Sequence, residues 1–249
     1  WANNAMLKRV KVDAALVKGL PANERDYIGH ENDFTPTGYF AESRWDQVRN
    51  KVPAPSRETM LKAAREAVKV NNGYGVTAWM DAASNAGNGD SLFDFTATEQ
   101  SYGVLPFYRE LAEKGELSAH VAALMLTNSK SKPADLEVVA KVMKKFEGVP
   151  NLTFPGIKIF ADGIMEFPGQ TAAVIVPYKN TNKRGQLLID PKHFGELVVA
   201  AEKRGWIMHV HADGDRAVRE ALNGVAYARR LNPTPVAHSL AHLQVVDPE

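Results

Sequence analysis

The feature that most constrains the fold is a repeated alternation of strand-like and helix-like segments after residue 73. Short apolar segments bounded by turn residues predict strands at 75–81, 117–126, 157–162, 206–211 and 236–243. Segments with apolar residues at helical spacing predict helices at 56–73, 103–114, 133–146, 193–204 and 215–230. The alanines of 117–126 leave a buried helix open as the alternative there. Alternation of this kind predicts an α/β fold, a parallel sheet with helices outside it.

Length and strand count disagree about how much of a barrel is present. The 249 residues match a complete (β/α)8 barrel, which typically has about 250 residues. The chain nevertheless alternates only about five times, too few to close a barrel of eight strands. Because each unit is visible, we predict a partial (β/α)8 barrel. Residues 56–249 form this barrel segment, and residues 1–55, punctuated by glycine and proline, form an irregular segment with a short helix near 4–18.

Charge and composition exclude several classes of function. The net charge is +1 and the basic residues are scattered, which argues against nucleic-acid binding. No apolar segment approaches the roughly 18 residues of a membrane span. Without cysteine the chain has neither disulfides nor thiolate zinc ligands. We expect a cytoplasmic protein, or a periplasmic one if a signal precedes Trp1, and the open edges of a partial barrel favour a homo-oligomer.

Two histidines stand where a metal site is expected. His211 ends one predicted strand and His242 lies near the end of the next. Active sites of barrels lie at the carboxyl ends of the strands, so these imidazoles are expected to converge there. Imidazole pairs are typical ligands of zinc and similar divalent ions. The alternative for each residue is a buried histidine that only packs.

Other polar residues surround these positions. Lys158 lies within an apolar strand, where burial of an ammonium group is costly unless it is paired or modified; the alternative is that it faces solvent. Asp162 ends that strand and is either a ligand of substrate or metal or a turn residue. His209, Asp213 and His238 are candidates to bind substrate or to support the ligands, with packing or helix capping as the alternatives.

Several sequence motifs, in order along the chain, resemble those of amidohydrolase family 3, often called YtcJ-like, within the amidohydrolase superfamily. HADGDRAVREAL at 211–222 and HSLAHLQVVDPE at 238–249 resemble two of its histidine segments, and KIFADG at 158–163 its lysine strand. A TAA element at 171–173 and a Pro-Tyr pair follow, as in the family. WANNAM at 1–6, PTGYFAE at 36–42 and the GVT of 75–77 are also similar to family motifs.

The resemblance implies a metallo-dependent hydrolase barrel in which Lys158, His211 and His242 bind metal. One or two divalent ions, zinc above all, would be held there, with Lys158 carboxylated so that it bridges them. The implied reaction is hydrolysis of a C–N bond in a small amide, N-acyl or cyclic amide substrate, by water that the metal activates.

This chain also departs from the family pattern. The His-x-His pair of the first strand and the aspartate of the eighth strand have no counterpart, so we expect the isolated chain to be inactive or nearly so. Ser239, Ala241 and Asp213 replace the residues that are usual in the family. Two alternatives stay open: a non-catalytic barrel fragment for binding or assembly, and a complete barrel of another hydrolase class that uses His209 and His211 with Asp213 or Asp215.

Overall fold

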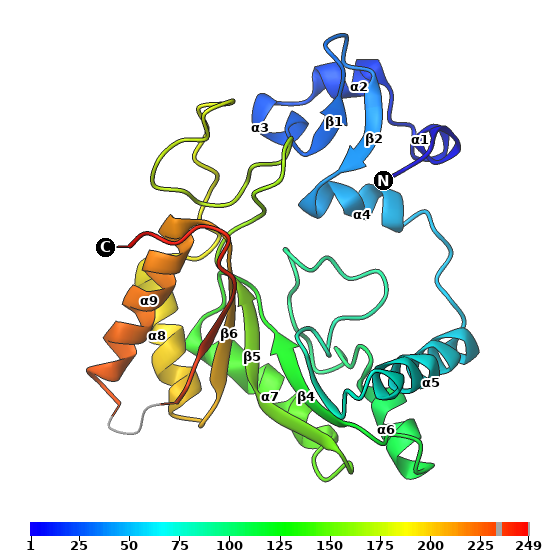
Figure 1. The fold of residues 1–249 in the computed structure, drawn as a ribbon, viewed down its shortest axis with the longest axis vertical. Helices are drawn as coiled ribbons and strands as arrows, with labels where there is room; N and C mark the ends of the chain where they lie inside the picture. The colour runs from blue at the N-terminus through cyan, green and yellow to red at the C-terminus, as the bar shows by residue number, and fades with distance from the viewer. Residues whose placement is uncertain (233–235, 249) are drawn as a thin grey trace.

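The computed structural model describes residues 1–232 and 236–248, and its centre is one curved parallel sheet (Figure 1). Five strands lie in sequence order, each parallel to its neighbours: β3 (Ala78–Asp81), β4 (His120–Leu126), β5 (Leu152–Phe160), β6 (Ile207–Ala212) and β7 (Ser239–His242). The predicted partial barrel is therefore confirmed. The segment that could have been a buried helix forms β4.

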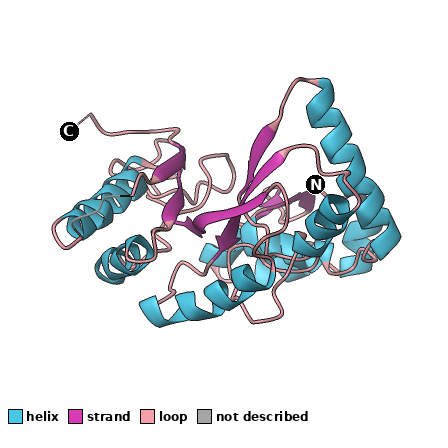
Figure 2. Ribbon diagram, turned by 90° about the horizontal axis from the view of Figure 1, so that it is seen from below, coloured by secondary structure: helices cyan, strands magenta, loops and turns pink. Residues whose placement is uncertain are grey.

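Helices cover the convex face of this sheet (Figure 2). They are α5 (Arg57–Gly73), α6 (Leu105–Glu113), η2 (Pro133–Asp135) with α7 (Leu136–Lys145), α8 (Pro191–Glu202) and α9 (Asp215–Arg229). Ser56 caps α5, its hydroxyl accepting from Thr59 N at 3.1 Å, as expected for a serine before a helix. None of the described helices combines the length and apolar character that a membrane span requires.

Strand alternation separates the core from the polar face. In β5 and β6 the residues Ile157, Ile159, Met208 and Val210 are fully buried in the main hydrophobic core with the helices. Alternate residues point to the other side of the sheet. Lys158, His209 and His211 consequently share the concave face.

The N-terminal segment is more regular than predicted. It contains α1 (Asn4–Val10), α2 (Ala14–Gly19), α3 (Ala22–Arg25), an antiparallel pair of β1 (Ile28–His30) and β2 (Pro36–Phe40), η1 (Glu42–Arg44) and α4 (Trp45–Arg49). The helix expected near 4–18 is interrupted at Lys11, where φ is 56°. A separate small core holds these elements together: Leu7, Val12, Val17, Ile28, Phe40 and Val48. Helices of four to seven residues are too short to show a clear apolar period. The boundary at residue 55 stays a prediction.

A buried polar network closes the amino-terminal end of β6 and β7. The side chains of Glu202 and His238 are 0% and 3% exposed, and His238 Nε2 lies 3.0 Å from Glu202 Oε1. Met208 N donates to His238 Nδ1 at 3.0 Å, so Nε2 carries the proton and donates to the carboxylate. Arg229 and Asn232 also donate to Glu202.

This network shows the surroundings of His238, for which the sequence left open a role near the substrate or ligands and a packing role. His238 lies just before β7, at the opposite end of that strand from His242, where both ring nitrogens are engaged. The alternative of a packing role is the one that the structure supports.

The network makes stability depend on pH. Burial lowers the pKa of His238 below 6.5, against the opposing effect of Glu202. Burial opposes ionisation of Glu202 too, but its hydrogen bonds to Asn232 and His238 hold its pKa below the ordinary value. Below about pH 6.5 the unfolded chain therefore binds a proton on His238 that the folded chain does not, and stability falls as pH falls.

We predict that His238→Gln makes this pH dependence shallower. Urea unfolding between about pH 5 and 7 gives the free energy of unfolding at each pH. The slope of this free energy against pH should fall by up to the contribution of one proton, roughly 1.4 kcal/mol per pH unit. His120→Gln, at an exposed position, controls for the loss of any histidine. Equal slopes in His238→Gln and the parent chain would contradict the assignment.

Candidate metal centre

The strand register places the polar residues of the concave face in two layers. Lys158 pairs with His209, and His209 with Ser239, across β5, β6 and β7. The next layer toward the carboxyl ends pairs Phe160 with His211. His211 thus lies at the edge of the sheet, and His209 lies one layer deeper.

His211 is oriented by a backbone carbonyl. Its Nε2 lies 2.6 Å from Gly163 O, and because a carbonyl only accepts, Nε2 carries the proton. Burial lowers the pKa of His211 to about 4, so the ring is neutral at neutral pH. A neutral ring that donates one N–H to a backbone carbonyl is the usual state of a metal-ligating histidine. The unprotonated Nδ1 of His211 is therefore the ring nitrogen that can bind a metal.

His242 reaches this site through a local change of backbone. In the register it opposes Ala212, a core residue on the helix-covered face. Continued alternation would direct His242 to that face. Instead His242 and Leu243 have φ of 78° and 53°, in the left-handed region. The His242 ring lies 4.5 Å from that of His211 between centroids, so the two imidazoles are adjacent.

Lys158 is buried without a hydrogen bond. It is 5% exposed, and its Nζ has no hydrogen-bond partner among the described residues. The solvent-facing alternative is therefore wrong. Nζ lies 4.6 Å from the centroid of the Phe160 ring. Burial lowers the pKa of Lys158 to about 8, against the opposing charges of Asp213 and Asp162.

Asp162 organises the backbone around the site. Its carboxylate accepts from Asp213 N at 3.0 Å and from Gly214 N and Ala173 N at 2.9 Å. Burial raises the pKa of Asp162 to about 6 although these three bonds favour the ionised form. Both oxygens are thus engaged in joining β5, the 163–190 loop and the start of α9. This geometry supports an organising role for Asp162 over direct contact with substrate.

Two further candidates, Asp213 and His209, differ in whether their polar atoms have hydrogen-bond partners. Asp213 Oδ1 is buried without a hydrogen-bond partner in the described part of the chain, and its Oδ2 lies 3.8 Å from His211 Nε2. The alternative that Asp213 caps the helix does not hold, since Gly214 is the N-cap of α9. His209 Nδ1 lies 2.7 Å from Ser239 Oγ, a contact that sequence reasoning missed.

Two aromatic rings border the site, and sequence reasoning missed them as well. The Phe160 ring lies 5.0 Å from the His211 ring and 4.8 Å from Phe93, which belongs to the 82–101 loop. Strand alternation from Lys158 would have placed Phe160 on this face. Nothing in the sequence indicates that a loop residue such as Phe93 returns to it.

The side chains present fit part of the ligand set of a metal ion. Among residues 1–232 and 236–248, no group of three or more His, Cys, Asp and Glu side chains is arranged to hold a metal ion. Two adjacent imidazoles nevertheless lie near two buried polar atoms without partners, Lys158 Nζ and Asp213 Oδ1. Unsatisfied buried groups of this kind are expected where an ion or other group completes a site.

Comparison with known proteins identifies the family. A model described as the amidohydrolase family matches residues 1–249. The chain belongs to the amidohydrolase family. It is 28% identical over 250 residues to the exoenzymes regulatory protein AepA of Pectobacterium carotovorum subsp. carotovorum, covering 100% of this chain and 49% of that protein. It is 25% identical over 242 residues to the putative amidohydrolase YtcJ of Bacillus subtilis strain 168, covering 95% of this chain and 40% of that protein.

Solved structures of two metal-dependent hydrolases support the fold. An uncharacterized metal-dependent hydrolase from Pyrococcus furiosus matches with a TM-score of 0.54 at 22% identity, covering 91% of this chain and 41% of that one. A second such hydrolase, from Pyrococcus horikoshii OT3, matches with a TM-score of 0.54 at 20% identity, covering 96% of this chain and 46% of that one. The chain spans about half or less of the length of these relatives. The alternative of a barrel from another hydrolase class is wrong.

We predict that replacing the buried lysine raises stability. Lys158→Met keeps most of the length of the side chain and removes the buried amine, so the free energy of unfolding should rise by about 1–3 kcal/mol. Urea denaturation measures the change, and Lys130→Met, at an exposed position, should give a change near zero. A loss of stability in Lys158→Met alone would show that Nζ is already satisfied.

Proposed function

We propose that this chain is part of the catalytic barrel of a metal-dependent hydrolase that cleaves C–N bonds in amide, N-acyl or cyclic amide substrates. One observation carries the proposal: the rings of His211 and His242 lie 4.5 Å apart at the carboxyl edge of the sheet. The buried amine of Lys158, which has no hydrogen-bond partner among the residues that the structure describes, lies on the same face. Family membership and the likeness to metal-dependent hydrolases support it.

The proposed ligands are His211 through Nδ1, His242, and Lys158. A divalent metal, most simply zinc, would supply Lewis acidity toward a carbonyl oxygen and make water a better nucleophile at neutral pH. Lys158 would serve as an anionic oxygen donor after its neutral amine adds to CO2 and releases a proton, which forms a carbamate. The lowered pKa of Lys158, about 8, favours this step because a larger fraction of the amine is unprotonated.

Other residues would prepare the site for substrate. Asp162 fixes the turn that carries Asp213, and Gly163 O holds the His211 ring in the ligating tautomer. The ring of Phe160, with Phe93 behind it, would shield one side of the His211 imidazole from water. Exclusion of water strengthens electrostatic interactions with a substrate carbonyl. Asp213 is the carboxylate best placed to approach a polar group of the substrate.

The complete activity would belong to the whole protein, since this chain spans 49% and 40% of its curated relatives. We expect the isolated chain to hydrolyse amide substrates slowly or not at all. The second candidate function is non-catalytic, in binding or assembly, and the regulatory name of one relative favours it. It requires association through the outer edges of β3 and β7, which have no strand partner among the described residues. Light scattering would then show an oligomer.

We predict that the chain binds zinc through β6 and β7. After purification with zinc and without chelators, elemental analysis should find about one or two ions per chain, lost in both His211→Ala and His242→Ala. His120→Ala removes an exposed histidine at the amino-terminal end of β4 and should retain the metal. Zinc that persists in His211→Ala, or is absent from the parent chain, would overturn the proposed metal site.

A further inference from the structure

Two N-terminal motifs without an assigned role form one structural unit. Ala2 N donates to Gly38 O at 2.7 Å, and the rings of Trp1 and Tyr39 meet at 5.3 Å between centroids. Gly38 has φ of +92°, and a Cβ at this position would overlap Ala2 O. The WANNAM and PTGYFAE segments therefore pack closely on each other, and Glu42, the last residue of the second motif, lies two residues after the end of β2.

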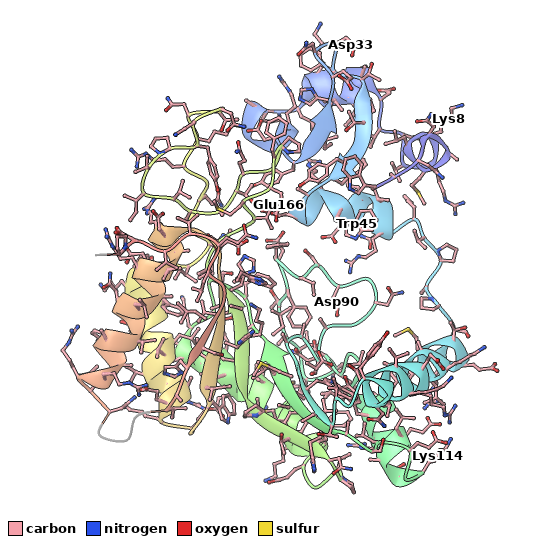
Figure 3. All side chains as sticks on the ribbon, viewed as in Figure 1. Lys8, Asp33, Trp45, Asp90, Lys114 and Glu166 are labelled. Carbon is pink, nitrogen blue, oxygen red and sulfur yellow. The ribbon has the colours of Figure 1, made fainter. Side chains whose placement is uncertain are left out.

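This unit lies beyond the carboxyl ends of the central strands, next to the 163–190 loop (Figure 1). Figure 3 labels Glu166 on the part of that loop nearest to the N-terminal elements. It also labels Asp90, on the 82–101 loop below α4, where Arg49 donates to Gly89 O at 2.8 Å. The N-terminal elements consequently contact both loops that border the candidate metal centre.

Glu42 makes the contact nearest to the site. Thr171 Oγ1 accepts a hydrogen bond from Ile164 N at 3.0 Å, so the hydroxyl proton is free to point elsewhere. It is donated to Glu42 Oε1. A Cβ at Gly163 would overlap both Thr171 Oγ1 and Glu42 Oε1, which shows how closely this pair packs on the Gly163 backbone.

The contact continues to a proposed metal ligand. Gly163 O accepts the proton of His211 Nε2 at 2.6 Å, and this bond selects the tautomer with Nδ1 available. Glu42, Thr171, Gly163 and His211 thus form a continuous series of contacts from the N-terminal unit to the imidazole. The Glu42 backbone has φ of 47°, a costly conformation for a residue with a side chain.

We propose that Glu42 is a positioning residue for His211: the N-terminal segment holds the Gly163 carbonyl in place through Glu42 and Thr171, and so sets the tautomer of the imidazole. The consequence for metal affinity rests on the proposed function, whereas the tautomer does not. Thr171 must donate in this arrangement, so residue 42 must accept. A glutamine can accept through its amide oxygen, and alanine cannot.

The tautomer of His211 in the metal-free full chain tests the proposal directly. Long-range ¹H–¹⁵N NMR at neutral pH, with the His211 signal assigned by its loss in His211→Gln, should show the proton on Nε2. Glu42→Ala and Thr171→Val should each give a mixture of tautomers, whereas Glu42→Gln and Thr171→Ser should retain Nε2–H. Glu31→Ala removes an exposed carboxylate of the same segment and should change nothing. An unchanged His211 signal in folded Glu42→Ala and Thr171→Val would overturn the proposal.

Zinc affinity gives a second readout. Glu42→Ala and Thr171→Val should each weaken binding by roughly tenfold, in the range found for groups that support metal ligands. If both residues act through one hydrogen bond, the double variant should lose no more zinc affinity than the single variant that binds zinc more weakly. Additive losses would contradict a shared path. If the parent chain binds no zinc, the proposed function fails, and the tautomer measurement alone decides the role of Glu42.

Discussion

The carboxylate of Asp162 holds together the parts of the chain that make the candidate site. Three backbone N–H groups from two distant segments converge on it, at 2.9 to 3.0 Å. These bonds tie the end of β5 to the 163–190 loop and to the turn after β6. The carbonyl of Gly163, next in the chain, can then meet the imidazole of His211. The position of the His211 ring thus depends on hydrogen bonds between side chains and backbone groups: three to the Asp162 carboxylate and one from His211 to Gly163 O.

The same face of the sheet carries polar groups that the described chain does not satisfy. Lys158 Nζ and Asp213 Oδ1 are both buried without hydrogen-bond partners. Each such group costs stability unless another ligand compensates for it. At the opposite end of the sheet, by contrast, Glu202 and His238 are buried and fully engaged. The two ends of the sheet thus differ: Glu202 and His238 have hydrogen-bond partners at the amino-terminal end, whereas Lys158 Nζ and Asp213 Oδ1 have none among the described residues.

The sequence was sufficient for the central architecture and for the identities of the main candidates. Alternation at period two predicted that His209 and His211 share one face, because β6 is regular through these residues, but it left the face of Lys158 open. Period alone could not place His242, which reaches the site through positive φ. Sequence position did separate His238 from His242, since four residues along a strand place them at its two ends. The other elements of residues 1–49 were missed because each is short, and Glu42 because its partner Thr171 is 129 residues away.

Crystals grown with zinc and measured at the zinc absorption edge would test the central claim most directly. The account predicts an anomalous peak at the carboxyl edge of β6 and β7, within coordination distance of His211 Nδ1 and His242, with Lys158 beside it. A peak at another group, such as Glu202 and His238, or no peak in crystals that contain zinc, would contradict it. In that case the unsatisfied polar face would need another explanation.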